Sequence, residues 1–120
     1  MSILFVQYEK CGTCRKAKAY LDKNGIDYVS RPIKEEPPTL EELKKWHKES
    51  GLDLKRFYNT SGQLYRQNNI KDKIKTMSID EQYKLLASNG MMVKRPIVVG
   101  KDFVLVGFKE SEWNEKLKSL

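Results

Sequence analysis

Residues 3–21 read ILFVQYEKCGTCRKAKAYL, and this segment joins a predicted strand, two cysteines and a predicted helix. Residues 3–6 form a short run of β-branched and aromatic side chains, which is typical of a strand. Cys14, Ala17 and Leu21 then recur at helical spacing. The two cysteines therefore lie where a helix begins.

The position of Cys11 favours a thiolate. A helix N-terminus leaves backbone N–H groups unpaired and carries a partial positive charge, and both stabilise a negative sulfur. Lys10 is adjacent in the sequence, and Arg15 follows one helical turn later. We therefore expect the pKa of Cys11 to lie below its ordinary value, and we predict that Cys11 is a nucleophile.

Cys14 differs from Cys11 in the direction that it faces. Its helical phase turns it towards the buried side, together with Ala17 and Leu21. A shielded thiol three residues from an activated one can close a disulfide after attack, so Cys14 is the predicted resolving thiol. We expect Gly12 to relax the turn between them.

Two other interpretations of this CxxC motif stay open. It is also half of a typical zinc site, but such a site needs about four ligands. The chain contains two cysteines and one histidine, His47, so zinc binding would need a second chain. The pair could also be inert. The strand–CxxC–helix context favours redox chemistry, and we expect no bound metal or cofactor.

The length and charge of the chain limit its class. Its 120 residues predict one domain, 1–120, and we expect a monomer. A net charge of +7 favours anionic partners such as glutathione, an oxyanion or an acidic protein surface. Acidic residues are interspersed among the basic ones, so solvated helix faces also explain the charge, and direct nucleic-acid binding is not expected. Without a signal or membrane-spanning pattern, we expect a cytoplasmic protein.

The middle of the chain predicts a strand followed by helices. Residues 26–33 form a second strand, expected to lie parallel to the first in a right-handed βαβ unit. Thr39 and Glu42 predict a capping box that opens a helix, and residues 53–75 predict short helical pieces. Ser78 and Glu81 predict another capping box. His47, on the first of these helices, is interpreted as packing, with a catalytic base as the alternative.

The sequence pattern of the last part of the chain predicts a β-hairpin followed by a helix. Residues 93–107 are rich in β-branched side chains and turn at residues 100–102, and residues 110–120 have helical spacing. The chain is therefore predicted to be an α/β protein with a mixed four-stranded sheet and flanking helices. A helical insertion at about 38–90 separates the βαβ half from the C-terminal ββα half.

Two separated motifs, YEKCGTCRKAKAYLDKNGIDY and KRPIVVGKDFVLVGFKESEW, resemble the bacterial ArsC/Spx/MgsR family. The resemblance implies a thioredoxin-like, glutaredoxin-like fold with a redox-active CxxC. It also implies that Pro96 is cis and lies against the cysteine loop, and that Arg95 lies beside the active cysteine and holds an anion or steadies the thiolate. Gly12, Thr13 and Arg15 complete the predicted substrate-binding or thiolate-stabilising residues.

The family resemblance leaves three functions open. The first is a thiol–disulfide oxidoreductase that works with glutathione, a glutaredoxin or a thioredoxin. The second is a regulator of the Spx or MgsR type that binds the RNA polymerase α subunit. The third is an arsenate reductase, whose three arginines match Arg95, Asn59 and the region of Gly107 and Phe108, so that only Arg95 is an arginine here.

Overall fold

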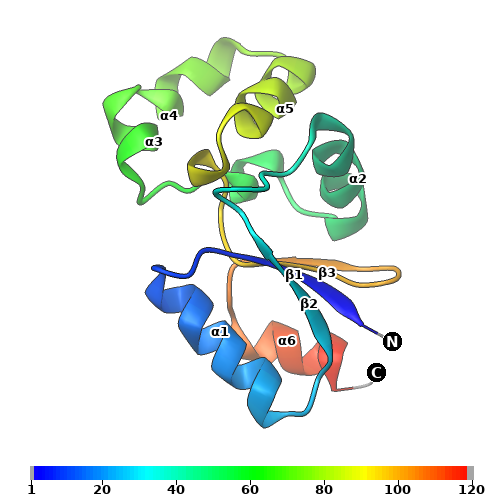
Figure 1. Ribbon diagram of the computed structural model, residues 1–120. Helices are drawn as coiled ribbons and strands as arrows, with labels where there is room; N and C mark the ends of the chain where they lie inside the picture. The colour runs from blue at the N-terminus through cyan, green and yellow to red at the C-terminus, as the bar shows by residue number, and fades with distance from the viewer. Residues whose placement is uncertain (1, 119–120) are drawn as a thin grey trace.

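The fold is built on a four-stranded mixed sheet (Figure 1). The computed structural model describes residues 2–118. The strand order is β2-β1-β3-β4; β1 and β2 are parallel, whereas β3 runs antiparallel to both β1 and β4. The strands are β1 (Ile3–Gln7), β2 (Tyr28–Pro32), β3 (Ile97–Val99) and β4 (Val104–Val106). The predicted α/β architecture is confirmed.

Helices cover both faces of this sheet. In Figure 1, α1 and α6 lie below the sheet and the helices that connect β2 to β3 lie above it. The α-helices are α1 (Gly12–Lys23), α2 (Leu40–Ser50), α3 (Gln63–Gln67), α4 (Ile70–Lys73), α5 (Ile79–Ser88) and α6 (Glu110–Leu117). Three 3-10 turns, Leu54–Phe57, Ile74–Thr76 and Gly90–Met92, complete the helical connection.

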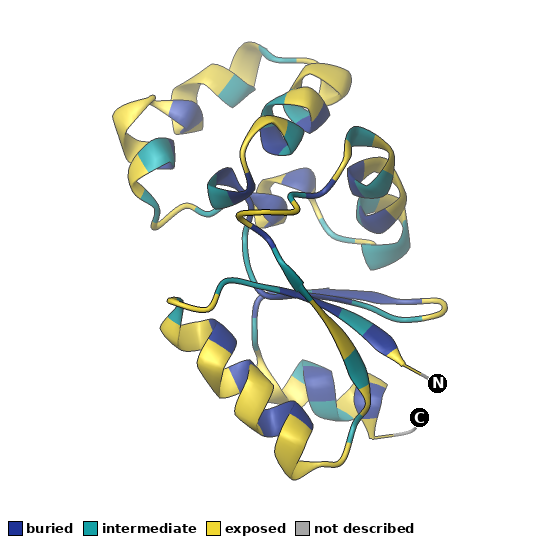
Figure 2. Ribbon diagram, viewed as in Figure 1, coloured by how far each residue is buried: buried dark blue, intermediate teal, exposed yellow. Residues whose placement is uncertain are grey.

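Strand alternation divides the apolar side chains into two cores, visible as buried residues on both sides of the sheet in Figure 2. Successive side chains of a strand point to opposite faces. On β1, Phe5 packs on the side of α1 and α6, while Val6 packs against the helical connection. Trp113 is 1% exposed in the first core, and Phe57 is fully buried in the second.

Local signals in the sequence account for two of the helix starts. Thr39 accepts from the Glu42 backbone while Glu42 accepts from the Thr39 N–H, and Ser78 and Glu81 form the same pair of bonds. Both predicted capping boxes are therefore confirmed. Helix α2 ends at Gly51, whose φ of 68° lies in the left-handed region that glycine adopts without strain.

Some boundaries differ from the sequence predictions. Strand β2 covers 28–32 instead of 26–33, because the Ile26 N–H is bonded to the end of α1. Residues 93–96 lie outside β3; Val93 makes only an isolated bridge with Tyr58, and Pro96 has no N–H to offer a ladder. The last two residues of the predicted 110–120 helix lie outside the described part of the chain.

Candidate active site at the CxxC motif

Cys11 is the N-cap residue of α1. Its backbone is extended, with φ −90° and ψ 122°, and its carbonyl accepts the first helical bond from the Arg15 N–H at 3.1 Å. The Cys11 N–H donates to the Tyr8 carbonyl at 3.0 Å, which closes the loop between β1 and α1. Its side chain is partly exposed. A sulfur at this position lies next to the unpaired N–H groups of the first helical turn.

Cys14 lies one turn into the same helix and is only 2% exposed. It belongs to the buried face of α1, which includes Ala17 and Leu21. Its sulfur accepts a hydrogen bond from the Tyr8 backbone N–H at 3.4 Å. The helix therefore presents one sulfur to solvent and encloses the other.

The surroundings of the two thiols move their pKa values in opposite directions. Burial raises the pKa of Cys11, but hydrogen bonds from the Cys14 backbone N–H and thiol, together with the Arg95 guanidinium, lower it by more, so the net shift is downward. Burial, the largest cause, and the neighbouring Cys11 together raise the pKa of Cys14 to about 12. The site therefore makes Cys11 the more acidic thiol of the pair and keeps Cys14 a thiol at neutral pH.

Arg95 reaches this site from the segment before β3. The Arg95–Pro96 peptide bond is cis. The Arg95 guanidinium carbon lies 4.9 Å from the centroid of the Tyr8 ring. Its Nε and Nη1 atoms are buried and have no hydrogen-bond partner among residues 2–118. Buried donors of this kind are normally satisfied, so the site has unused capacity to bind an acceptor.

The other predicted site residues lie in the first turn of α1. Gly12 and Thr13 are exposed. A Cβ at position 12 would meet nothing within 4 Å and the residue has no positive φ, so neither space nor backbone conformation requires glycine in this turn. The Arg15 Nε donates to the Glu9 carbonyl at 3.2 Å, which fixes the β1–α1 loop. The cation that lowers the pKa of Cys11 is Arg95.

Two pockets flank the motif. The first, about 400 Å³, is lined by Asn59, Ser61, Gly62, Gln63, Leu64, Met91 and Arg95. The second, about 390 Å³, is lined by Gln7, Tyr8, Glu9, Cys14, Arg15 and Lys18. Arg95 is the charged side chain in the lining of the first pocket, whereas the second pocket carries two basic groups and one acidic group.

Two of the three positions that match the arginines of arsenate reductases hold other residues, Asn59 and Gly107. Asn59 lies in the same pocket as Arg95, and its Nδ2 donates to the Met91 carbonyl at 3.3 Å. Gly107 has a φ of 77°, in the left-handed region. Neither position supplies a cation, so Arg95 is the one arginine of that set in this chain.

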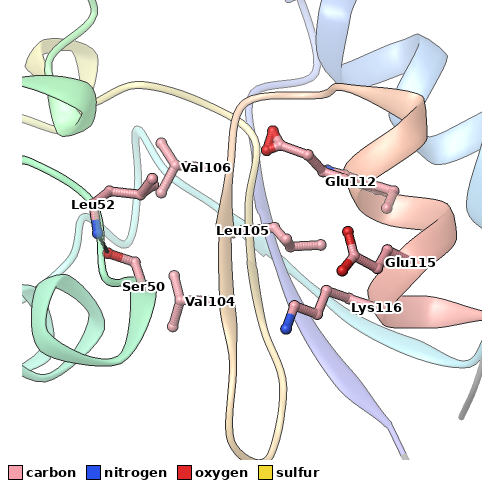
Figure 3. Close-up of a pocket in the computed structure, with 9 residues that line it drawn as sticks. Ser50, Leu52, Val104, Leu105, Val106, Glu112, Glu115 and Lys116 are labelled. Atoms are coloured by element: carbon pink, nitrogen blue, oxygen red, sulfur yellow. Dashed lines mark hydrogen bonds between the residues drawn. The ribbon is translucent and has the colours of Figure 1, made fainter.

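Two further features lie away from the cysteines. A pocket of about 170 Å³ lies at the free edge of β4. In Figure 3, Leu52 and Val104 lie on one side of this strand, and Glu112 and Glu115 lie on the other. His47 bonds through Nδ1 to the Tyr83 hydroxyl at 2.6 Å, in the packing role expected for it.

The structure gives no metal or membrane feature within residues 2–118. No group of three or more His, Cys, Asp or Glu side chains there could hold a metal ion. None of the helices in this part of the chain is both long enough and apolar enough to cross a bilayer.

Sequence reasoning missed Tyr8. Its ring contacts Arg95, and its backbone contacts both cysteines. The sequence signal was only its place three residues before Cys11, because the contact with Arg95 depends on the complete sheet.

Comparison with known proteins agrees with this geometry. The ArsC family matches residues 6–116. The uncharacterized protein YusI of Bacillus subtilis (strain 168) is 52% identical over 115 residues, covering 96% of this chain and 98% of YusI. The global transcriptional regulator Spx 2 of Bacillus anthracis is 32% identical over 102 residues, covering 85% of this chain and 76% of Spx 2.

A solved structure gives the same result for the fold. The crystal structure of an ArsC family related protein from Bacteroides fragilis is 51% identical and superposes with a TM-score of 0.93, over 96% of this chain and 97% of that one. The chain described here belongs to the ArsC family and has its thioredoxin-like fold.

Proposed function

We propose that this protein is a cytoplasmic thiol–disulfide oxidoreductase in which Cys11 is the nucleophile and Cys14 the resolving thiol. One observation carries the proposal: the partly exposed Cys11 has a lowered pKa, and the buried Cys14 beside it has a raised one. Thiolates attack disulfides and thiols do not, so the site selects which sulfur reacts first.

The reaction proceeds in two exchanges. The Cys11 thiolate attacks one sulfur of a disulfide RS–SR′, which forms the mixed disulfide Cys11–S–SR and releases R′S⁻, which takes a proton from water. Cys14 then gives its proton to solvent and attacks the Cys11 sulfur, which forms the Cys11–Cys14 disulfide and releases RS⁻, and RS⁻ takes up a proton from solvent. Two equivalents of a thiol such as glutathione return the pair to the dithiol and leave as a disulfide.

The high pKa of Cys14 does not block the second step. Part of its elevation comes from the neighbouring Cys11, and the charge on Cys11 disappears when that sulfur joins a mixed disulfide. The Tyr8 N–H and the charge of Arg95 both lower the Cys14 pKa and remain in place. Formation of the mixed disulfide therefore favours ionisation of Cys14, so the resolving step follows the attack by Cys11.

Arg95 supports a substrate that carries hydrogen-bond acceptors. Its two unpartnered buried donors adjoin a pocket of about 400 Å³ with the amide side chains of Asn59 and Gln63. A carboxylate or peptide carbonyl can satisfy such donors. Glutathione disulfide offers both groups, and we propose glutathione, a glutaredoxin or a thioredoxin as the reductant.

Adduct trapping tests the proposal. The reduced wild-type protein, Cys11→Ser and Cys14→Ser are incubated with oxidised glutathione and followed by intact-mass measurement. We expect Cys14→Ser to keep one glutathione, the wild type to pass to an internal disulfide, and Cys11→Ser to stay unmodified. Reaction of Cys11→Ser with oxidised glutathione at the wild-type rate would contradict the proposal.

A second candidate is a redox-responsive regulator that binds RNA polymerase and makes no DNA contacts of its own. The similarity to a global transcriptional regulator over 85% of this chain favours it. Purified α subunit of RNA polymerase, immobilised and presented with oxidised or reduced protein, tests it. Retention in one redox state supports the regulator, and no retention in either state removes it.

Arsenate reduction has less support, because Arg95 is alone at the three matching arginine positions. Arsenate or phosphate binding beside Cys11 would raise the pKa of that thiol through the added negative charge. An arsenate titration that leaves the Cys11 pKa unmoved removes the basis for this activity.

A further inference from the structure

Tyr8 contacts all three groups that define the site. Its carbonyl accepts from the Cys11 N–H at 3.0 Å, and its N–H donates to the Cys14 sulfur at 3.4 Å. Its ring centroid lies 4.9 Å from the guanidinium carbon of Arg95. These contacts join the loop before α1 to the segment before β3, which are far apart in the sequence.

The Tyr8 ring is one of two contacts that hold the Arg95 guanidinium at the site, and the other is its hydrogen bond to Cys11. No carboxylate pairs with Arg95 within residues 2–118, and its Nε and Nη1 have no partner there. A guanidinium within about 6 Å of a tyrosine ring centroid is attracted by the negative ring face. Without that face, only the hydrogen bond to Cys11 would hold the long Arg95 side chain, and rotamers that point away from Cys11 would become accessible.

We propose that Tyr8 is a positioning residue of this site: its ring holds the Arg95 guanidinium beside Cys11, while its backbone N–H holds the Cys14 sulfur. The inference rests on the proposed thiol–disulfide function. It goes further because it assigns the orientation of the cation to an aromatic side chain outside the CxxC motif.

The arrangement also joins the two pockets. Tyr8 lines the pocket that includes Cys14, and Arg95 lines the pocket that includes Asn59. The ring–guanidinium contact therefore lies between them. With the ring at one side of the guanidinium, the acceptor of a bound substrate approaches Arg95 from the Asn59 side.

The two parts of Tyr8 make separable predictions. The backbone contacts persist whatever the side chain, so a substitution at this position tests the ring alone. Tyr8→Phe keeps the aromatic face and removes only the hydroxyl, whereas Tyr8→Leu removes the face and keeps an apolar side chain. Tyr8→Leu is expected to release Arg95 and raise the Cys11 pKa, while Tyr8→Phe behaves as the wild type.

A double-mutant cycle on the full-length protein tests this. The alkylation rate of Cys11 by iodoacetamide is measured against pH for wild type, Tyr8→Phe, Tyr8→Leu, Arg95→Met and the double variant Tyr8→Leu/Arg95→Met. Tyr8→Leu should raise the Cys11 pKa by roughly half a unit and slow alkylation at pH 7 about threefold. In the Arg95→Met background the same change should have no further effect. Tyr28→Leu, at a tyrosine on β2 whose ring packs edge-to-face with Phe5, is the matched control.

Two results would overturn the inference: an equal pKa shift from Tyr8→Leu with and without Arg95, or a shift in Tyr8→Phe as large as in Tyr8→Leu. Should Tyr8→Leu not fold, Tyr8→Met replaces it as a second non-aromatic variant. Alkylation needs no disulfide substrate, so the cycle is interpreted independently of the glutathione adduct. A wild type that forms no adduct would contradict the proposed function while the coupling between the two side chains stands.

Discussion

Gly90 allows a quantitative test of how the helical connection meets the sheet. A Cβ built at this position would lie 2.0 Å from the Ile33 carbonyl oxygen and 2.9 Å from its carbon. Ile33 is fully buried, and its N–H is bonded to the Gln7 carbonyl at 2.8 Å. Because the clash is with backbone atoms, no side-chain rotation relieves it. Gly90→Ala must therefore displace the backbone at residue 90 or at Ile33 by at least about 1 Å.

The cost of Gly90→Ala follows from two opposing effects. Overpacking of this kind costs typically about 1–3 kcal/mol, and a backbone clash belongs at the upper end. Alanine also lowers the conformational entropy of the unfolded chain, which stabilises the folded protein by about 0.4–1 kcal/mol. The net loss is therefore about 2 kcal/mol in the free energy of unfolding. For a chain of this size, the melting temperature should fall by roughly 8 °C.

Urea unfolding measured by tryptophan fluorescence provides the assay, because Trp46 and Trp113 lie in the two different cores. The matched control is Gly12→Ala, the same chemical change at a site where a Cβ meets nothing within 4 Å. We expect the midpoint of Gly90→Ala to fall by about 1 M and that of Gly12→Ala to stay or rise. Equal midpoints for the two variants would refute the reasoning.

Three other substitutions test separate parts of the structure. Glu42→Gln removes a charge that Arg31 binds at 2.6 and 2.8 Å, so urea titration at pH 7 should show a loss of about 1–2 kcal/mol. The bond from Arg31 holds the pKa of Glu42 below its ordinary value. The stability difference between wild type and Glu42→Gln should therefore be complete above about pH 5 and vanish as the pH falls through the lowered native pKa of Glu42. A stability difference that does not depend on pH would contradict this. His47→Gln should destabilise the fold and leave the Cys11 alkylation rate unchanged, whereas a slower rate would make His47 part of the site. Trp113→Phe breaks a buried bond to the Gly107 carbonyl and should cost about 1–3 kcal/mol by thermal unfolding; a change under about 0.5 kcal/mol would show that this bond is dispensable.

Features set by near neighbours could be predicted from the sequence. The capping boxes at Thr39 and Ser78 depend on side chains three residues apart, so their spacing suffices. The same holds for the two cysteines, since helical phase alone exposes Cys11 and buries Cys14. The cis bond before Pro96 was expected from the family resemblance and is present.

Features set by the complete fold could not be predicted. Arg15 was expected to stabilise the Cys11 thiolate, but its Nε is bonded to the Glu9 carbonyl, and Arg95 supplies the cation. The contact between Tyr8 and Arg95 depends on the pairing of β3 with β1, which brings the two distant segments together. Nothing in the local sequence around either residue encodes that meeting.

The division of labour between the cysteines explains the CxxC pair in physical terms. In the mechanism that we propose, the partly exposed Cys11 attacks as a thiolate, and the buried Cys14 stays protonated until the charge on Cys11 is lost. The same helix creates both environments, because its first turn faces solvent at Cys11 and its buried face includes Cys14.

The most direct test of this account is the pH dependence of alkylation at each cysteine of the reduced wild-type protein, with the modified residue identified by peptide mass. We predict that Cys11 is alkylated first, with a midpoint below the ordinary cysteine pKa, and that Cys14 is modified only after Cys11, because burial and the intact Cys11 raise the pKa of Cys14 to about 12. Equal rates at the two cysteines, or modification of Cys14 before Cys11, would contradict the account.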